Sequence, residues 1–284
     1  MSDQDVNPVP PAVLAEIVEH KRGEVERLKS SRSMTELEAE VAQAEPPRNF
    51  FRAVTEGGRS GDGTTAVIAE IKRQSPSAGL IRPEYEGDGF DPAAVARRYH
   101  AAGAAAISCL TDETFFGGHL SFIQRVKEAA PLPVLRKDFI VDPIQLWESR
   151  AAGADAVLLI AEVLTEGQII DMMILAQRLG LTVLLEVHSM ENLLRVRPHV
   201  GFPHPSYCLL GINNRDLTTM TTDVAHTTRL VDLVDDPGVL VSESGISEPA
   251  DLARLREVGV RIVLVGEHLM RQDDPGAALS DLLR

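Results

Sequence analysis

The sequence predicts an α/β fold, a (β/α)8 TIM barrel with an N-terminal helical extension. Short apolar runs alternate eight times with segments of helical period between residues 66 and 284. The runs are apolar throughout rather than alternating, as expected for parallel strands that are buried on both faces. Glycine recurs where a helix would end and the next strand begin, as at Gly103 and Gly153. Eight such units are the number that closes a barrel.

The apolar runs give the expected strands, and the segments between them give the expected helices. The strands are Ala66–Ile71, Ala104–Leu110, Pro133–Leu135, Ala156–Ile160, Thr182–Val187, Cys208–Ile212, Val239–Val241 and Ile262–Val265. The helices are Pro92–Ala102, Leu120–Ala129, Pro143–Ala152, Glu166–Leu179, Met190–Val196, Val224–Val234, Pro249–Val258 and Pro275–Leu283. A doubly wound sheet is the structural alternative, but residues 73–79 lack the Gly-rich turn expected after its first strand.

Helices are also expected before the first strand. Pro11 can open a helix, because its missing N–H costs nothing in the first turn, and apolar residues recur at helical spacing from Val13 to Leu28. A second helix is expected over Met34–Ala44, and Pro46 with Pro47 ends it.

The domain prediction follows from these elements. Residues 1–50 form a helical extension that packs on the barrel, and residues 51–284 form the catalytic barrel. Polar and proline-rich residues 1–10 are expected to be mobile, and Thr55–Thr64, rich in Gly, Ser and charge, is expected to be a surface loop. A small insertion at residues 201–205 is expected on the barrel face away from catalysis.

Composition excludes several function classes. The net charge is −14, so a general nucleic-acid-binding surface or an anionic membrane partner is not expected. Cys109 and Cys208 lie in apolar runs and are expected to be reduced core thiols, and no Cys/His cluster has zinc-ligand spacing. The polar start is not a signal peptide, and no apolar run reaches the roughly 20 residues of a membrane span. These features predict a cytoplasmic protein.

Ionisable residues at strand ends predict the active site. Side chains at the carboxyl ends of barrel strands converge on one mouth. Glu70 and Lys72 end the first expected strand, and because they are two residues apart, they face the same side. The alternative is a solvated strand end with an ordinary ion pair. Arg136 and Lys137 are adjacent at the end of the third strand, so at most one of them enters the mouth.

Three later strands also end in polar groups, at Glu186, at Asn213 to Asp216, and at Ser242 to Ser244. One such end is weak support for a site. Five polar strand ends in register on a barrel indicate an active site, because packing and stability alone do not repeatedly place charged residues at these positions.

The loops after the last two strands predict a phosphate site. Ser244-Gly245-Ile246-Ser247 follows the seventh strand, and Gly266-Glu267-His268-Leu269 follows the eighth. Small residues that open a short helix expose backbone N–H groups at its positive end. In barrels, a phosphate commonly lies between these two loops. The alternative for either glycine is a simple turn.

Seven stretches resemble the indole-3-glycerol phosphate synthase family of tryptophan biosynthesis, and the resemblance covers nearly the whole chain. They are Glu-Ile-Lys-Arg-Gln-Ser-Pro-Ser at 70–77, Leu-Thr-Asp-Glu-Thr-Phe-Phe-Gly-Gly at 110–118, Leu-Arg-Lys-Asp-Phe-Ile-Val-Asp-Pro at 135–143, Gly-Ala-Asp-Ala-Val-Leu-Leu-Ile at 153–160, Leu-Glu-Val-His at 185–188, Gly-Ile-Asn-Asn-Arg-Asp-Leu at 211–217 and Ser-Glu-Ser-Gly-Ile at 242–246.

The resemblance implies a carboxy-lyase that converts 1-(o-carboxyphenylamino)-1-deoxyribulose 5-phosphate to indole-3-glycerol phosphate by ring closure, loss of CO2 and loss of water. It implies no cofactor and no metal. The implied partner is this small phosphorylated substrate, with no nucleic acid and no membrane, and with transient contact to other tryptophan-pathway enzymes.

The resemblance also implies catalytic roles. Lys137 is the usual candidate for the acid of ring closure, although Lys72 can also serve. Glu70 resembles the base of dehydration, and Glu186 and Lys72 resemble its proton-handling partners. Asn213 matches the residue that orients the ketose. A lysine acid works best with a lowered pKa, which a second lysine would favour and the two glutamates would oppose.

Binding roles are implied for the remaining matches. The substrate-binding residues are Ser75, Phe115, Phe139, Arg215 and Glu243, with the two phenylalanines holding the anthranilate ring. The phosphate-binding residues are Lys72, Ser244, Gly245, Gly266 and Glu267, with Ser75 belonging to the same set.

Two histidines depart from the family pattern. His268 stands where the family has Ser in the loop after the eighth strand, so it lacks a hydroxyl contact but keeps the backbone N–H, and its imidazole can assist as a cation at lower pH. His119 stands where Ser is common and begins the second helix. The alternatives are another sugar-phosphate barrel such as phosphoribosylanthranilate isomerase, whose Cys/Asp pair is missing here, or a non-catalytic binding paralogue.

Overall fold

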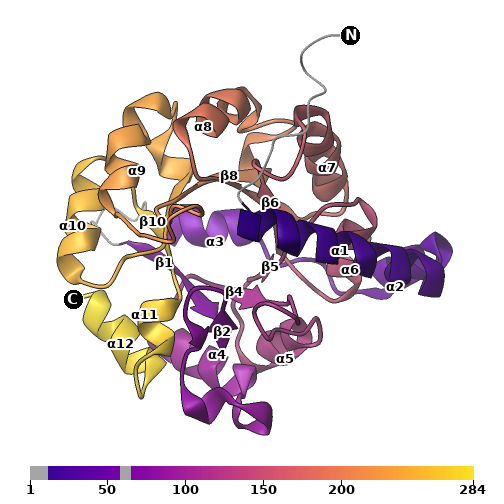
Figure 1. Ribbon diagram of the computed structural model, residues 1–284, viewed down its shortest axis with the longest axis horizontal. Coiled ribbons are helices and arrows are strands. Elements are labelled where there is room, and N and C mark those ends of the chain that lie inside the picture. Colours follow the sequence, from indigo (N-terminus) through magenta and orange to yellow (C-terminus); the bar gives the residue numbers. More distant parts are fainter. Residues whose placement is uncertain (1–11, 58–64) are drawn as a thin grey trace.

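Eight parallel strands close into a barrel (Figure 1). In the computed structural model, which describes residues 12–57 and 65–284, each strand pairs with the next along the barrel, and the last pairs with the first. This confirms the predicted barrel and excludes the doubly wound sheet. The strands are β1 (Ala66–Ile71), β4 (Ala106–Leu110), β5 (Val134–Lys137), β6 (Ala156–Ile160), β7 (Thr182–Val187), β8 (Cys208–Asn213), β9 (Leu240–Glu243) and β10 (Ile262–Val265).

Helices surround the barrel at the expected places, with bounds that shift by a few residues. Local sequence begins and ends them. For example, Asp91 and Thr165 accept a backbone hydrogen bond at two helix starts, and Gly103 and Gly153 adopt positive φ just after two helix ends. The outer helices are α4 (Pro92–Ala101), α5 (Phe122–Ala129), α6 (Ile144–Ala151), α7 (Glu166–Arg178), α8 (Met190–Val196), α9 (Ala225–Leu230), α10 (Pro249–Glu257), the short α11 (Glu267–Met270) and α12 (Pro275–Leu282).

Three helices precede β1 and run from one end of the barrel to the other. Helices α1 (Ala12–Ser31) and α2 (Met34–Gln43) make up the predicted extension, and α3 (Phe50–Gly57) begins at its boundary. The view in Figure 1 shows α1 crossing in front of the strands. At the opposite end, the amide of Phe51 in α3 bonds to Thr182 at the start of β7, so α3 covers the amino ends of the strands.

Helix α3 corrects the expected loop at Thr55–Thr64. Residues 55–57 are helical because Asn49 accepts a bond from the Arg52 amide at the helix start, and because Phe50 and Val54 are fully buried. The expectations for residues 1–11 and 58–64 lie outside the described residues. The division at residue 50 stays a prediction, since Leu14 and Val18 of the extension share one core with the barrel.

A buried lysine fixes α1 over the carboxyl ends of the strands. The Lys21 ammonium lies 3.0 Å from Asp112, after β4, and 2.9 Å from Asp138, after β5. The lysine side chain is only 3% exposed. Asp138 is held in place by Thr111 and Arg136 as well. The helix therefore forms one wall over the end of the barrel where its active site is expected.

A small hairpin follows β1. Its strands are β2 (Gln74–Ser75) and β3 (Gly79–Leu80), and the turn between them positions Ser77. Gly79 has φ +63°, which a residue with a side chain rarely adopts. The insertion at 201–205 precedes the amino end of β8, so it lies on the face away from the carboxyl ends, as expected.

Both cysteines lie in strands of the core. Cys109 and Cys208 are free and buried, which confirms the expectation for these two thiols. Within residues 12–57 and 65–284, no helix is long and apolar enough to cross a membrane.

Candidate active site

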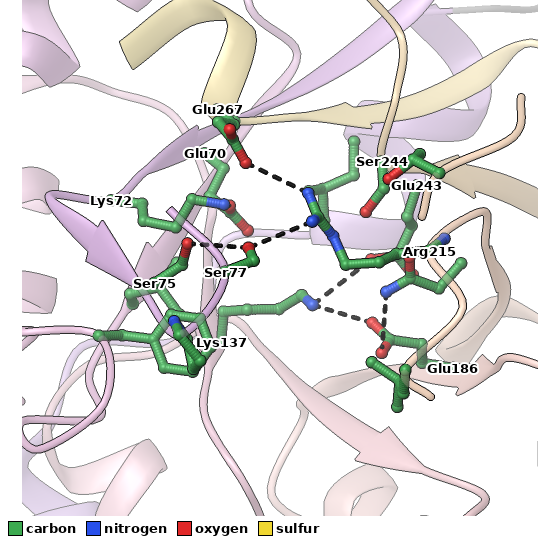
Figure 2. Close-up of a pocket in the computed structure, with 18 of the residues that line it drawn as sticks. Glu70, Lys72, Ser75, Ser77, Lys137, Glu186, Arg215, Glu243, Ser244 and Glu267 are labelled. Carbon is green, nitrogen blue, oxygen red and sulfur yellow. Dashed lines mark hydrogen bonds and ion pairs between the residues drawn. The ribbon is translucent and has the colours of Figure 1, made fainter. Parts of the chain in front are cut away.

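A pocket of about 420 Å³ opens at the carboxyl ends of the barrel strands, with α1 along one side. Figure 2 shows side chains from several strands and loops pointing into it. All five residues predicted as catalytic line this pocket: Glu70, Lys72, Lys137, Glu186 and Asn213.

Glu70 and Lys72 form an ion pair in the pocket wall. The Lys72 ammonium lies 2.7 Å from Glu70 Oε1, and the two side chains are 12% and 7% exposed. The hydroxyl of Ser108 donates to the other Glu70 oxygen at 3.4 Å. Gly266 on the neighbouring loop leaves room for Glu70, because a Cβ there would collide with its carboxylate. The pair is therefore buried in the mouth rather than solvated at a strand end.

Lys137 is the centre of a second buried cluster. Its ammonium donates to Glu186 at 2.8 Å and lies 3.5 Å from Glu243 (Figure 2). Asn213 donates to the other oxygen of Glu186 at 3.3 Å. Gly211 on β8 leaves room for Glu243, because a Cβ there would collide with its carboxyl group.

The charges in this cluster shift the pKa values of its members. Burial disfavours the Lys137 ammonium, but the carboxyls of Glu186, Glu243 and Glu70 outweigh it and raise the pKa of Lys137. Burial likewise opposes the Glu186 carboxylate, yet Lys137 and then His188 lower its pKa. Lys137 is therefore a cation in the free pocket. The carboxylates raise the pKa of Lys137 by more than the second lysine, Lys72, could lower it.

Glu243 shifts in the opposite direction. Burial, followed by repulsion from the Glu186 carboxylate, raises the pKa of Glu243 well above its usual range. Within the described chain, neither oxygen of Glu243 accepts a hydrogen bond, but a protonated Glu243 can donate to the neighbouring Glu186 carboxylate. A protonated carboxyl beside an ionised one is an arrangement that suits proton transfer.

Arg136, the residue before Lys137, points out of the barrel as alternation along β5 requires. Its guanidinium bonds to Asp138 at 3.1 Å and to Glu148 at 2.8 Å. Only Lys137 of this adjacent pair therefore enters the pocket.

Four of the five predicted substrate-binding residues line the pocket: Ser75, Phe139, Arg215 and Glu243. Arg215 reaches across the mouth, donating to Ser77 at 3.1 Å and to Glu267 at 3.2 Å (Figure 2). Ser77, on the turn of the hairpin, was not predicted.

Phe115 is the exception, because it is not among the residues that line the pocket; its substrate-binding role stays a prediction. Its ring packs edge-on against His20 of α1, 5.7 Å between centroids, while Phe116 lines the pocket and lies 5.9 Å from Phe139. The reason is a tight turn in which Asp112 accepts from both phenylalanine amides, so the two rings point to different sides.

The predicted phosphate-binding residues also line the pocket: Lys72, Ser244, Gly245, Gly266 and Glu267. Ser244 and Gly245 both have positive φ, 68° and 81°. His268 lines the same part of the pocket. The Glu267 side chain does not suit a phosphate, because it is an anion paired with Arg215 and Arg271, and those contacts help to lower its pKa against the effect of burial. Only its backbone remains a candidate ligand.

Sequence patterns missed further residues of the pocket wall. Leu14 and Ile17 contribute from α1, because the sequence does not say where the extension packs. His188 also lines the pocket, with its side chain 8% exposed. The signal for His188 was present, since it directly follows the strand that ends at Val187.

Comparisons with known proteins agree with this geometry. The family model described as indole-3-glycerol phosphate synthase matches residues 14–282. Indole-3-glycerol phosphate synthase of Rhodospirillum rubrum is 45% identical over 271 residues, 95% of this chain and 98% of that protein. The protein of the same name from Acidithiobacillus ferrooxidans is 44% identical over 270 residues, again 95% and 98%.

Solved structures support the fold alone. A 3-hexulose-6-phosphate synthase superposes with a TM-score of 0.58 at 15% identity, covering 76% of this chain and 97% of the other. A tryptophan synthase alpha chain from Legionella pneumophila gives 0.54 at 16% identity, covering 83% and 95%.

The family match spans the strand ends, both loops of the predicted phosphate site and α1, so the isomerase alternative is excluded. The chain belongs to the indole-3-glycerol phosphate synthase family, the carboxy-lyases of tryptophan biosynthesis.

Proposed function

We propose that the pocket converts 1-(o-carboxyphenylamino)-1-deoxyribulose 5-phosphate to indole-3-glycerol phosphate with Lys137 as the acid of ring closure. The observation that carries this assignment is the buried contact of Lys137 with Glu186, beside a second carboxyl at Glu243. Such a cluster holds a cation where negative charge develops on the substrate.

Ring closure joins the anthranilate ring carbon to the ketose carbonyl. The carbonyl oxygen takes a proton from the Lys137 ammonium as its charge develops. A raised pKa makes Lys137 a weak acid in the empty pocket, but an oxygen that becomes an alkoxide is a still stronger base. Asn213 orients the ketose, and Glu186 holds both Lys137 and Asn213 in place. CO2 then leaves to restore the aromatic ring and needs little assistance.

Dehydration completes the indole ring. Glu70 takes the proton from the ring intermediate, and an acid protonates the hydroxyl that leaves as water. Lys72 is suited to this second role, since it is 2.7 Å from Glu70. Glu186 and Lys137 form the other proton-handling pair.

The two ends of the substrate fit different parts of the pocket. The phosphate binds at the loops after β9 and β10, where Ser244, Gly245 and Gly266 line the pocket beside the Lys72 ammonium. The anthranilate ring lies against Phe116 and Phe139, with the apolar wall of α1 nearby.

The remaining proposals concern partners and context. The small phosphorylated substrate is the proposed partner, with no nucleic acid, no membrane and only transient contact with other enzymes of the pathway. A charged sugar phosphate does not cross membranes unaided, so the enzyme is proposed to work in the cytoplasm where that substrate is made. The proposed organisation is the extension at 1–50 and the catalytic barrel at 51–284.

A fluorescence assay tests the function. The anilino-deoxyribulose phosphate is supplied to the purified chain, and formation of indole-3-glycerol phosphate is followed by indole fluorescence. The expected result is turnover without added metal or cofactor. If the folded protein produces no indole fluorescence, the result would contradict the proposal and favour a non-catalytic paralogue.

A further inference from the structure

His188 lies in the pocket but has no place in the roles described so far. It directly follows β7, two residues after Glu186, so both side chains point toward the mouth. The His188 side chain is only 8% exposed. An imidazole so deeply buried in an active site needs partners for both of its ring nitrogens.

Each ring nitrogen of His188 faces a carboxylate. Nδ1 lies 3.2 Å from Glu162 Oε2, and Nε2 lies 3.3 Å from Glu186 Oε1. A neutral imidazole carries one N–H and one lone pair, so it can donate to only one of these partners and its lone pair would face the other. An imidazolium presents an N–H to each carboxylate, one in the hydrogen bond with Glu162 and one in the ion-pair contact with Glu186. The geometry therefore favours the charged form.

Glu162 is built to hold the ring in place. Its carboxylate accepts the His188 backbone amide at 2.8 Å and the Asn192 side chain at 3.0 Å. It is 6% exposed. Glu162 follows β6 and does not line the pocket, so it acts on the chemistry only through His188.

The charges around His188 also balance when it is protonated. The groups that act on it are Glu162, Glu186 and Lys137, and His226 Nε2 donates to its backbone carbonyl at 3.2 Å. With Glu243 neutral, the three described carboxylates of the cluster face three cations: Glu70, Glu162 and Glu186 against Lys72, Lys137 and His188.

We propose that His188, held between Glu162 and Glu186, is a positioning residue that works as an imidazolium to fix the orientation and negative charge of Glu186. Glu186 in turn orients Lys137 and Asn213. This proposal deepens the proposed function and rests on it.

The pH dependence has a definite sign. The pKa of His188 is raised, since Glu162 and Glu186 outweigh the opposing effect of burial. Its positioning is therefore complete below the usual histidine value of 6.5 and is lost as the pH rises through the folded-state pKa. Above that pH, a lone pair of the ring faces Glu186, and the carboxylate turns away from Lys137.

The test compares Glu162→Gln, His188→Asn and His188→Gln with the intact chain. Glu162→Gln removes one carboxylate, so His188 should titrate at lower pH, and the alkaline limb of kcat should move in the same direction. His188→Asn should lower kcat about 10- to 100-fold with KM changing less than about threefold, because a misplaced catalytic group costs rate rather than binding. His188→Gln keeps an N–H donor for Glu186, so its kcat should lie above that of His188→Asn. Its pH profile should lack the alkaline decrease in kcat that is assigned to His188.

Direct titration separates this proposal from the function on which it rests. The ring resonance of His188 is identified by its loss in His188→Asn and followed by NMR against pH, with no substrate present. Glu166→Gln is the matched control, because His199 and Glu166 also form a His–Glu pair, 2.6 Å apart, outside the pocket. A His188 titration and a kcat profile that Glu162→Gln leaves unchanged would overturn the proposal. An intact chain that fails to turn over, with the titration shift still present, would instead contradict the proposed function.

Discussion

Two lysines of this chain are buried between pairs of carboxyl groups, one beneath α1 and one in the pocket. Lys21 meets the buried pair Asp112 and Asp138, and also Glu24 of its own helix at 2.6 Å, and it is 3% exposed. Lys137 meets Glu186 and Glu243, and it is 13% exposed. In both cases the surrounding carboxyls outweigh burial and raise the pKa of the lysine.

The difference lies in how completely the carboxyls are bonded. Asp138 accepts from Lys21, Arg136, Thr111 and its neighbouring amide, and the pKa of Asp138 is lowered despite its burial. Neither oxygen of Glu243 accepts a hydrogen bond within the described chain, and its pKa is raised. Asp112 Oδ2 makes only its ion pair with Lys21, so the contrast is between Asp138 and Glu243: a carboxylate held by several donors resists protonation, whereas one without donors can take up a proton.

The two clusters share a strand. Lys137 ends β5 and Asp138 directly follows it; the Lys137 side chain meets Glu186 and Glu243, whereas the Asp138 side chain meets Lys21 of α1. A single β5 end therefore carries both a structural cluster and a catalytic one, and substitutions in each should have different consequences.

The largest expected effect comes from Lys137→Ala. Loss of the proposed acid should lower kcat about 1,000-fold or more, because general acid catalysis contributes on this scale. Substrate binding should weaken only modestly. Steady-state kinetics and equilibrium binding of the product check both. Full retained activity would remove Lys137 from the acid role.

Lys21→Met should act mainly on stability. It leaves Asp112 and Asp138 buried without their cation, and breaking a buried pair in this way costs about 3–5 kcal/mol. Because α1 forms part of the pocket wall, KM should rise as the helix detaches. Denaturant unfolding and kinetics measure the two effects.

The matched control for Lys21 lies on the same helix. Lys29 pairs with Asp142 at 2.6 Å but is 42% exposed, so Lys29→Met should cost less than about 1 kcal/mol. Equal losses of stability in the two variants would show that burial does not distinguish these pairs.

Glu243→Gln should have opposite effects on stability and activity. A folded-state pKa raised above the unfolded value means that Glu243 costs stability increasingly as the pH rises above about 4.5, the usual value for glutamate. The amide removes that cost, so stability at neutral pH should rise by about 1 kcal/mol. Activity should fall at least about tenfold. Thermal melts at pH 4 and pH 7 test the sign, and a gain that is larger at pH 4 would contradict it.

Sequence patterns were sufficient for the barrel and for the strand-end residues. Uniform apolar runs located all eight strands, and alternation placed Glu70 with Lys72 on one face. These features depend on local periodicity, which a single sequence contains. Helix α3 was missed because its buried face, at Phe50 and Val54, is defined only by the barrel end that it covers.

Long-range contacts explain where the site geometry differs from the expectation. The Asp112 turn, which separates Phe115 from Phe116, is fixed by the Lys21 contact about 90 residues away in the chain. Likewise, the sequence does not show that the Glu267 side chain pairs with Arg215, which leaves only its backbone as a candidate phosphate ligand. A resemblance transfers a motif, but which neighbour of a motif faces the pocket depends on the packing around it.

The smallest expected effect comes from the two adjacent phenylalanines, which lie where the Lys21 cluster meets the pocket. Phe116→Ala should raise KM about tenfold, since it removes an aromatic wall beside Phe139 and its contact with the anthranilate ring. Phe115→Ala should change KM less than about threefold, because its ring contacts His20 of α1 rather than the pocket. The comparison needs both variants at equal folded fraction, measured by circular dichroism. If Phe115→Ala has the larger effect on KM, the aromatic contact with α1 matters more to the substrate than the pocket wall itself, and the structural and catalytic clusters are less separate than their bonding indicates.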